Sequence, residues 1–377
     1  MHTTTTFSDL SEHVARKRSR TGFASVRPRL GFIGPMIGRN RGYVTTQGQI
    51  LADLFARDGY HVISASKYLP RLKRFFDTVR VLVAARRQID ILHIDIYGGL
   101  SFVMEDVASR LGRLFGHSIV MTLHGGALPT FMAKYPRWTH RVLQRADVLV
   151  TPSPFLARAA SRHGFTATIV PNVIDLDDYP YLHRSSVKPR LLWMRSFHEL
   201  YNPFMAVRVL AGLRQLYPDA TLVMAGQDKG LEAETKRLAD ELGVSASIKF
   251  AGFLDKRRKA IEARAADIFI NTSRVDNTPV ALIEACAFGL PVVTTNVGGI
   301  QDLMTNEDNG LIVGSEREGP MVEAVRQLIV EPGLAAQLSL NGRQLAQRSA
   351  WSDVRVRWEQ IFMYLQTRVR GIASDVA

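Results

Sequence analysis

Two carboxylates, Asp276 and Glu284, stand with seven residues between them around the start of an otherwise apolar segment. Thr278 suits the N-cap, and Pro279 suits the first helical position, where its missing N–H costs nothing. Gly289 can end the helix in a left-handed conformation. The pattern therefore predicts that Asp276 lies on the loop before a short helix and that Glu284 lies inside it.

A helix start between two carboxylates offers unpaired N–H groups and a positive dipole end, which suit a phosphate. Glu284 is the only charged residue from Thr278 to Val293. A helix this apolar is expected to be buried, with Glu284 pointing into a cleft. Alternatively, Glu284 pairs with a nearby arginine and only holds the structure; the segment alone does not decide between the two.

The elements that must position these residues alternate along the chain after residue 28. A first series of expected strands covers residues 30–33, 60–64, 91–96, 119–123, 148–150 and 168–170. A second series follows the polar, proline-containing segment 179–189 and covers residues 190–194, 221–225, 247–250, 268–270, 291–294 and 311–313. Helical periodicity between the strands predicts an α/β fold with parallel sheets covered on both faces. Two such series predict two doubly wound, Rossmann-like domains that face a cleft.

Doubly wound sheets bind ligands beyond the carboxyl ends of their strands. Arg195 closes the first strand of the second series and is either a phosphate ligand or a surface cation. His124 precedes two glycines and either approaches a ligand or is an ordinary loop histidine. Gly298 and Gly299 either expose consecutive N–H groups or form a plain tight turn. The glycine-rich segment 34–42 does not fit G-x-G-x-x-G, which disfavours a nicotinamide enzyme.

Charge is distributed unevenly over the 377 residues. The net charge is +13, yet residues 1–190 hold 27 Lys and Arg against 13 Asp and Glu, and residues 191–377 hold 21 against 22. The basic half predicts an anionic partner: a phospholipid surface, a lipid-phosphate substrate or, less favoured because no binding motif accompanies the charge, nucleic acid. One cysteine, Cys286, and the lack of an apolar signal or spanning segment lead us to expect a cytoplasmic protein.

One basic stretch is also amphipathic. Apolar residues recur at helical spacing and basic residues flank them: Leu69, Leu72, Phe76, Val79 and Val83, with Arg71, Lys73, Arg74, Arg80, Arg86 and Arg87. The segment could lie on an anionic membrane. The spacing alone favours an ordinary helix with its apolar side in the core and a solvated basic face. Near the C-terminus, Trp351, Trp358, Phe362 and Leu365 are expected to pack a helix rather than to bind sugar.

In combination, these motifs resemble glycosyltransferase family 4, the retaining GT-B sugar-nucleotide transferases, over about residues 29–368. The matching segments are Pro171 to Asp175, Arg195 with Asn202 and Pro203, and the helix from Asp276 to Glu284 continuing into residues 290–293 and 298–300. The resemblance implies that the C-terminal domain binds a nucleoside-diphosphate sugar and that the N-terminal domain binds the acceptor. It also implies that no metal ion or other cofactor is needed.

Roles follow from the resemblance position by position. Glu284 matches the carboxylate that accepts hydrogen bonds from the ribose hydroxyls, Asp276 the acidic residue that contacts donor-sugar hydroxyls, and Arg195 the arginine that binds the diphosphate. His124 matches a histidine near the donor sugar. The other implied donor contacts are Gly42, Gly252, Phe253, Asn277, Thr278, Pro279, Val280, Gly298 and Gly299.

Two positions depart from the family pattern. The first acidic residue is usually glutamate and is here Asp276, and Tyr201 stands where a lysine is usual. A neutral tyrosine cannot replace a charge-assisted contact to the leaving diphosphate, although Arg274, Lys229 or Lys256 could compensate. We favour a rearranged phosphate site. The alternatives are a catalytically silent subunit that binds nucleotide or a partner, and a sugar-nucleotide epimerase.

The Thr-rich and basic composition of the first residues, the two series of strands and the resemblance together predict the following organisation. Residues 1–28 form a disordered basic tail, 29–182 the acceptor domain, 183–350 the nucleotide-sugar domain, and 351–377 a helix that returns to the N-terminal domain. The expected partners are a nucleotide sugar and a glycan or lipid-linked acceptor. An anionic membrane surface is a further expected partner, which would place the protein peripherally at the inner face of a membrane.

Overall fold

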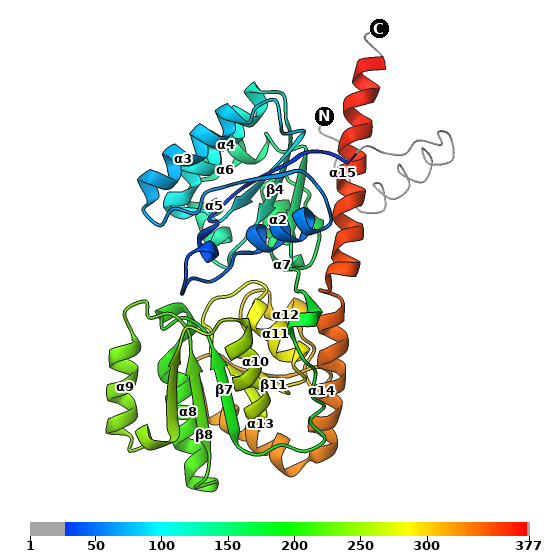
Figure 1. Ribbon diagram of the computed structural model, residues 1–377. Coiled ribbons are helices and arrows are strands. Elements are labelled where there is room, and N and C mark those ends of the chain that lie inside the picture. The colour runs from blue at the N-terminus through cyan, green and yellow to red at the C-terminus, as the bar shows by residue number, and fades with distance from the viewer. Residues whose placement is uncertain (1–26, 375–377) are drawn as a thin grey trace. The chain divides into compact units, whose positions relative to one another are not determined.

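The computed structural model describes residues 27–374, so the predicted tail lies outside the described residues except for its last two positions. The chain forms two compact units (Figure 1). The first ends at Val173 and resumes at Trp351, and the second comprises Ile174–Ala350. The second unit thus begins nine residues before the predicted start at 183. The reason is that Ile174 and Tyr179 are buried in its core against residues such as Phe288.

The first unit is built on a six-stranded parallel sheet in the order β2-β1-β3-β4-β5-β6. Its strands are β1 Leu30–Ile33, β2 Val62–Ala65, β3 Ile91–Ile96, β4 Ser118–Leu123, β5 Val148–Thr151 and β6 Thr168–Ile169. Its α-helices are α2 Gln47–Arg57, α3 Arg71–Ala84, α4 Phe102–Leu114, α5 Leu128–Lys134, α6 Pro136–Leu143, α7 Pro154–Arg162 and α15 Trp351–Ser374.

The second unit repeats this plan in the order β12-β11-β10-β7-β8-β9, again with parallel pairing. Its strands are β7 Arg190–Met194, β8 Thr221–Ala225, β9 Ile248–Gly252, β10 Ile268–Asn271, β11 Val292–Thr295 and β12 Leu311–Val313. Its α-helices are α8 Pro203–Leu216, α9 Glu232–Glu241, α10 Lys256–Ala265, α11 Val280–Ala287, α12 Ile300–Leu303, α13 Glu318–Val330 and α14 Pro332–Gln347.

Alternate residues of the central strand β7 enter different cores. Leu191 and Trp193 pack on one face of the sheet, while Leu192 and Met194 pack on the other. Because side chains alternate across a strand, a strand buried on both faces must be apolar throughout. All twelve predicted strands are present, with ends within two residues of their predicted positions. The expected α/β fold with two doubly wound domains is confirmed.

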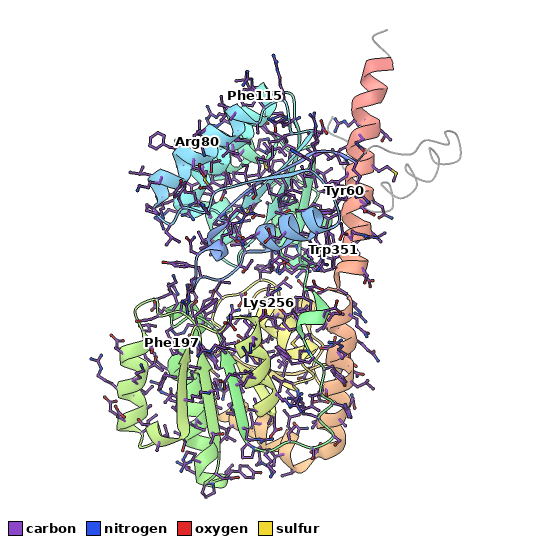
Figure 2. The ribbon with its side chains drawn as sticks, viewed as in Figure 1. Tyr60, Arg80, Phe115, Phe197, Lys256 and Trp351 are labelled. Carbon is purple, nitrogen blue, oxygen red and sulfur yellow. The ribbon has the colours of Figure 1, made fainter. Side chains whose placement is uncertain are left out.

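The aromatic residues near the C-terminus pack as predicted. Trp351, Trp358, Phe362 and Leu365 of α15 are buried in a core of the first unit, together with residues of α2 such as Phe55. Tyr60, which Figure 2 labels beside α15, donates a hydrogen bond to Glu359 at 3.1 Å. The last helix is therefore part of the first unit's fold.

The amphipathic helix α3 corrects our expectation from the sequence. The predicted core stripe is largely solvent-exposed, with Leu72 at 75% and Phe76 at 67% exposure. The face that α3 buries instead carries Thr78 and Leu82. Helical spacing shows that apolar residues share a face, but not that this face is the one turned to the core. Figure 2 labels Arg80 on this helix, and its side chain is mostly exposed.

The helix that carries Glu284 also differs in detail from its prediction. Helix α11 begins at Val280, and Pro279 rather than Thr278 occupies the cap position. Pro279 keeps an extended ψ of 116°, so it precedes the first helical turn instead of forming it. Gly289 follows the helix with φ of +81°, as predicted. Among residues 27–374, no helix combines the length and apolar character needed to cross a bilayer.

Candidate functional site

The second unit has its topological switch point between β7 and β10. Strands β7, β8 and β9 extend the sheet in one direction, and β10, β11 and β12 extend it in the other. Loops that leave the carboxyl ends of β7 and β10 therefore diverge and leave a crevice, the usual ligand site of such sheets. Arg195 directly follows β7, and Asp276 lies on the loop that joins β10 to α11. The fold thus brings these two predicted residues together.

Arg195 and Asp276 form an ion pair with both side chains largely buried. The second carboxyl oxygen of Asp276 accepts the backbone N–H of Asn277 at 2.9 Å, and Ser273 Oγ lies 3.3 Å from Oδ2. Arg195 Nε is buried and has no hydrogen-bond partner among residues 27–374. Because an unpaired buried donor costs free energy, this N–H favours the binding of an anion.

Tyr201, which stands where the resemblance leads us to expect a lysine, supports the arginine. The Arg195 guanidinium carbon lies 4.0 Å from the centroid of the Tyr201 ring, a cation–π arrangement. Arg274 pairs instead with Glu316 at 2.5 Å, and Lys256 pairs with Asp178. These contacts occupy two of the three cations that the sequence offered as substitutes for the missing lysine.

Glu284 is held by two partners that the sequence did not predict. Lys259 Nζ lies 2.7 Å and 2.8 Å from the two carboxyl oxygens, and the Tyr179 hydroxyl donates to Oε1 at 2.8 Å. Burial, and then the charge of Glu284, raises the pKa of Tyr179, so this hydroxyl remains a neutral donor. Glu284 is therefore paired with a cation, but with Lys259 rather than the arginine we had considered.

This pairing is compatible with ligand binding. A carboxylate offers about four acceptor positions, and the bonds from Lys259 and Tyr179 use three of them. Lys259 lies on α10 in the run from Lys256 to Lys259, which resembles a solvated basic face in the sequence. Residues three apart share a side of a helix, so the spacing from Lys256 does not indicate that Lys259 contacts a different neighbour.

The two glycines after β11 allow a close contact between loops. A Cβ atom on Gly298 would lie 1.9 Å from the Asp276 carbonyl oxygen, and one on Gly299 would lie 2.4 Å from that of Asn277. The Gly299 N–H donates to the Asp276 carbonyl at 3.3 Å. One of the N–H groups that we expected to face a ligand is thus used within the site. Asn277, Thr278 and the residues up to Val280 form the turn against which the glycines pack.

Gly252 ends β9, the edge strand of the same sheet, and Phe253 follows it. Gly252 has φ of +63°, and its carbonyl accepts the Gly226 N–H at 2.9 Å. The Phe253 carbonyl accepts from Arg258 Nη1 at 3.2 Å. A role for this segment in receiving the base stays a prediction.

Two predicted residues belong to the first unit. His124 follows β4; its Nε2 lies 3.0 Å from Asp95 Oδ1, and its ring stacks on Tyr97 with centroids 5.0 Å apart. Asp95, which the sequence analysis missed, is buried at the end of β3. Gly42 adopts φ of +84°, and a Cβ there would meet no atom within 4 Å. Their roles toward the donor stay predictions.

Similarity to known proteins identifies the family. The model for Glycosyl transferases group 1 matches residues 183–345, and that for Glycosyltransferase Family 4 matches residues 42–178. The chain belongs to glycosyltransferase family 4. Such a GT-B enzyme is a sugar-nucleotide glycosyltransferase, and these matches support this activity rather than a silent subunit or an epimerase.

This family 4 enzyme is similar to two mannosyltransferases of phosphatidylinositol compounds. It is 26% identical over 281 residues to a GDP-mannose-dependent alpha-(1-6)-phosphatidylinositol monomannoside mannosyltransferase of Mycobacterium tuberculosis, covering 69% of this chain and 71% of the relative. It is 27% identical to a phosphatidyl-myo-inositol mannosyltransferase of Propionibacterium freudenreichii, covering 57% and 55%.

Solved structures share the fold. Sucrose-phosphate synthase from Thermosynechococcus elongatus superposes with a TM-score of 0.77 at 19% identity, covering 91% of this chain and all of the other. Anabaena HepE in complex with UDP-glucose gives a TM-score of 0.70 at 16% identity, covering 90% and 100%. Both likenesses confirm the GT-B fold of this family 4 enzyme.

Proposed function

We propose that this glycosyltransferase moves a sugar, with retention, from a nucleoside-diphosphate sugar to a hydroxyl of a lipid-linked acceptor. The observation that carries the donor half is the set of buried, oriented side chains at one switch point. Arg195 retains a buried unpaired N–H, and Glu284 is fixed by Lys259 and Tyr179. The first suits a diphosphate, and the second suits ribose hydroxyls.

The reaction then follows from electrostatics. The acceptor oxygen bonds to the anomeric carbon as the bond from that carbon to the phosphate oxygen breaks, and the departing phosphate takes the acceptor's proton. Arg195 neutralises the charge that develops on the phosphate, and Tyr201 holds the guanidinium in place by stacking. Preorganised donors of this kind act without reorganisation during the reaction. Asp276 orients Arg195 and retains the position that contacts donor-sugar hydroxyls.

The acceptor half of the proposal rests on the exposed stripe of α3. Leu72 and Phe76 project from a helix that also carries Arg71, Lys73 and Arg80. Apolar side chains flanked by cations suit the interface of an anionic bilayer. Two relatives described above act on phosphatidylinositol derivatives. We therefore propose a peripheral position at the cytoplasmic face of a membrane, which also fits the single buried thiol, Cys286.

We further propose that no metal ion takes part in the transfer. Among the described residues, no group of three or more His, Cys, Asp or Glu side chains is arranged to hold a metal. What supports the proposal is the presence of fixed cationic and N–H donors to do the work of charge neutralisation. Turnover with purified enzyme in excess EDTA should equal turnover with added Mg²⁺. A loss of activity that Mg²⁺ restores would contradict it.

The donor site is tested by release of nucleoside diphosphate from candidate UDP-, GDP- and ADP-sugars. Glu284→Gln should raise the KM for the donor at least about tenfold, because a ribose contact to a charged acceptor is worth over 1 kcal/mol. Glu262→Gln is the matched control, since Glu262 is also buried and paired with a lysine, Lys249, at 2.5 Å. Equal activity of all three proteins with every donor would overturn the proposed site.

The membrane position is tested by flotation of the enzyme with phosphatidylcholine vesicles that carry phosphatidylglycerol. The double variant Leu72→Ser/Phe76→Ser should lose most vesicle binding while keeping donor hydrolysis. The control Leu216→Ser/Leu242→Ser changes two exposed leucines of the second unit and should bind like the wild type. Unchanged flotation of the α3 variant would contradict the membrane contact.

A further inference from the structure

A cavity of about 410 Å³ lies at the switch point of the first unit. Strand β1 neighbours β2 on one side and β3 on the other, so the chain changes direction between β1 and β3. The cavity is lined by the segment after β1, by the loop after β3, and by the first turns of α3 and α4. The residues that matter below are Arg71, Arg74, Gly98, Gly99, Ser101 and Glu105. Its lining includes Tyr97, which stacks on the predicted donor residue His124, but none of the predicted donor residues themselves.

Two arginines of this cavity have no acidic partner. Within residues 27–374, neither Arg71 nor Arg74 forms an ion pair with a carboxylate, whereas Arg80 on the same helix pairs with Asp77 at 2.8 Å. Burial, and then the charge of Arg71, lowers the pKa of Arg74, so the two cations destabilise each other. An anion placed between them would relieve this repulsion.

The helix that carries these arginines makes the arrangement still less favourable without a ligand. Arg71 and Arg74 occupy the first turn of α3, which contains no acidic residue, and no side chain caps the helix. Cations near a helix N-terminus oppose the helix dipole, and an anion there is stabilised by it. The same negative ligand would thus satisfy the two guanidinium groups and the exposed N–H groups of a 14-residue helix.

The opposite wall contributes an unpaired polar group. Glu105 is 1% exposed; its Oε1 accepts the Tyr97 N–H at 3.1 Å, and its Oε2 has no hydrogen-bond partner in the described part of the chain. Ser101 Oγ donates to the Gly98 carbonyl at 2.7 Å, and the Ser101 hydroxyl and the Gly98 N–H also act on the Glu105 carboxyl group. Burial raises the pKa of Glu105 to about 8, so its carboxyl group is mostly protonated at neutral pH and can donate a hydrogen bond.

The loop after β3, between these two walls of the cavity, allows a ligand to approach its backbone closely. Gly98 and Gly99 have φ of +78° and +65°, a left-handed conformation that residues with a Cβ rarely adopt. No atom lies within 4 Å of a Cβ built on Gly99. The backbone therefore presents a bare surface beside the two arginines and the buried acid.

We propose that this cavity binds the phosphate group of the acceptor, with Arg71 and Arg74 as its cationic ligands and Glu105 as a neutral hydrogen-bond donor. The inference rests on the proposed function and names the chemistry of its acceptor. A phosphate is small compared with the cavity, so room remains for the group that it joins. Leu100 at the rim is 74% exposed, as expected where the rest of an amphiphilic ligand leaves the cavity.

Binding is measured by calorimetry with glycerol 3-phosphate, and by flotation with phosphatidylcholine vesicles that carry phosphatidic acid. An Arg195→Gln background removes the phosphate ligand of the donor site. In this background, Arg71→Gln/Arg74→Gln should weaken binding about tenfold or more, because two charge-assisted contacts are lost. The matched control Arg86→Gln/Arg87→Gln removes the same charge from the same basic stretch and should stay within about twofold.

The two probes identify the source of the phosphate. If Arg71→Gln/Arg74→Gln weakens the binding of both glycerol 3-phosphate and the vesicles, a phosphate group alone suffices as the ligand. If it weakens only the binding of the vesicles, the ligand is the phosphate of a lipid headgroup. Equal weakening by the two double variants, or none by either, would overturn the proposal. Arg71→Lys/Arg74→Lys, which keeps the charge, should restore part of the affinity and shows that the site still folds.

A failure of this inference is distinguishable from a failure of the proposed function. With Arg195 intact, Arg71→Gln/Arg74→Gln should hydrolyse the donor sugar at the wild-type rate, yet lose transfer to a phosphorylated acceptor. If the wild type hydrolyses no donor sugar, the proposed function fails. If the variant transfers as well as the wild type, only the phosphate site fails.

Discussion

The two doubly wound units carry charged side chains at the same topological position. In the second unit these charges are paired within the protein, whereas in the described part of the first unit they are not. At the switch point of the second unit, Arg195 pairs with Asp276 and Lys259 pairs with Glu284. At that of the first unit, the two arginines at the start of α3 have no acidic partner within the described chain, and the nearby acid is mostly neutral.

This difference separates two ways to bind an anionic substrate. Internal ion pairs hold the donor-site side chains in fixed rotamers before the ligand arrives, at the cost of partly neutralising them. Unpaired cations keep their full attraction for the ligand but destabilise the empty protein. We therefore expect substitutions in the second unit to affect catalysis and those in the first to affect acceptor affinity and stability.

The largest effect is expected from the arginine of the paired site. Arg195→Gln should lower kcat for transfer and for donor hydrolysis about 10²- to 10³-fold, or about 3–4 kcal/mol, because a preorganised donor to the leaving group is lost. Arg274→Gln, a nearby arginine paired with Glu316, should change kcat little. A loss smaller than about threefold in Arg195→Gln would mean that another group neutralises the leaving diphosphate.

The neutral acid of the unpaired site should make stability depend on pH. The pKa of Glu105 is about 8 in the folded unit against 4.5 for the free side chain. The protonated Glu105 side chain is fully compatible with the fold below pH 4.5. Between that value and pH 8 only the unfolded chain loses the Glu105 proton, so the unfolding free energy falls as the pH rises through this range. Between pH 6 and 8, the wild type should lose about 2 kcal/mol of unfolding free energy that Glu105→Gln does not lose.

Urea unfolding of both proteins at each pH measures this difference. Asp95, whose charge also raises the pKa of Glu105, and the Tyr97 N–H, which lowers it, are unchanged in the variant. Glu323→Gln, at an exposed position, should follow the wild-type pH profile. Parallel profiles for wild type and Glu105→Gln would show that Glu105 is ionised in the folded protein.

The lysine that fixes Glu284 should affect the donor more than the chemistry. Lys259→Met removes the cation from a buried carboxylate, which then favours its protonated form and accepts ribose hydrogen bonds less well. The KM for the donor should rise about tenfold, or about 1.4 kcal/mol, with a smaller change in kcat. Lys256→Met, three residues away and mostly exposed, is the control. An unchanged KM would leave Lys259 with a structural role only.

The smallest effect is expected at Tyr201. Tyr201→Phe keeps the ring that lies under the Arg195 guanidinium and should retain kcat within about twofold. Tyr201→Ala removes the ring and should lower kcat about two- to fivefold, since Tyr201 is only partly buried and a cation–π contact beside solvent is worth about 0.5–1 kcal/mol. An equal loss in both variants would mean that the hydroxyl group, not the stacking, matters.

The positions of the strands could be predicted from the sequence better than the contacts between side chains. Alternating apolar runs located every strand because strands buried on both faces must be apolar throughout. Strand order then explains why Arg195 and Asp276 meet, although 80 residues separate them. Lys259 was missed because its contact depends on how α10 is rotated against α11, which spacing along one helix does not determine.

The first unit shows the same limit. The periodicity of α3 identified a stripe containing Leu72 and Phe76 but not its orientation, because the buried face uses Thr78 and Leu82 instead. Asp95 and Glu105 were missed because they lie in otherwise apolar or mixed segments and are recognisable only by burial. Orientation and burial are tertiary properties, so a single sequence carries little information about them.

Helix α15 gives the first unit a discontinuous sequence, with consequences for the order of folding. Its sheet is encoded before residue 174, but Trp358 and Phe362, which complete one of its cores, are encoded after the whole second unit. During synthesis, the second unit can fold as soon as it leaves the ribosome, while the first must wait with an apolar face uncovered. We therefore expect the part of the enzyme made first to be the last to become stable.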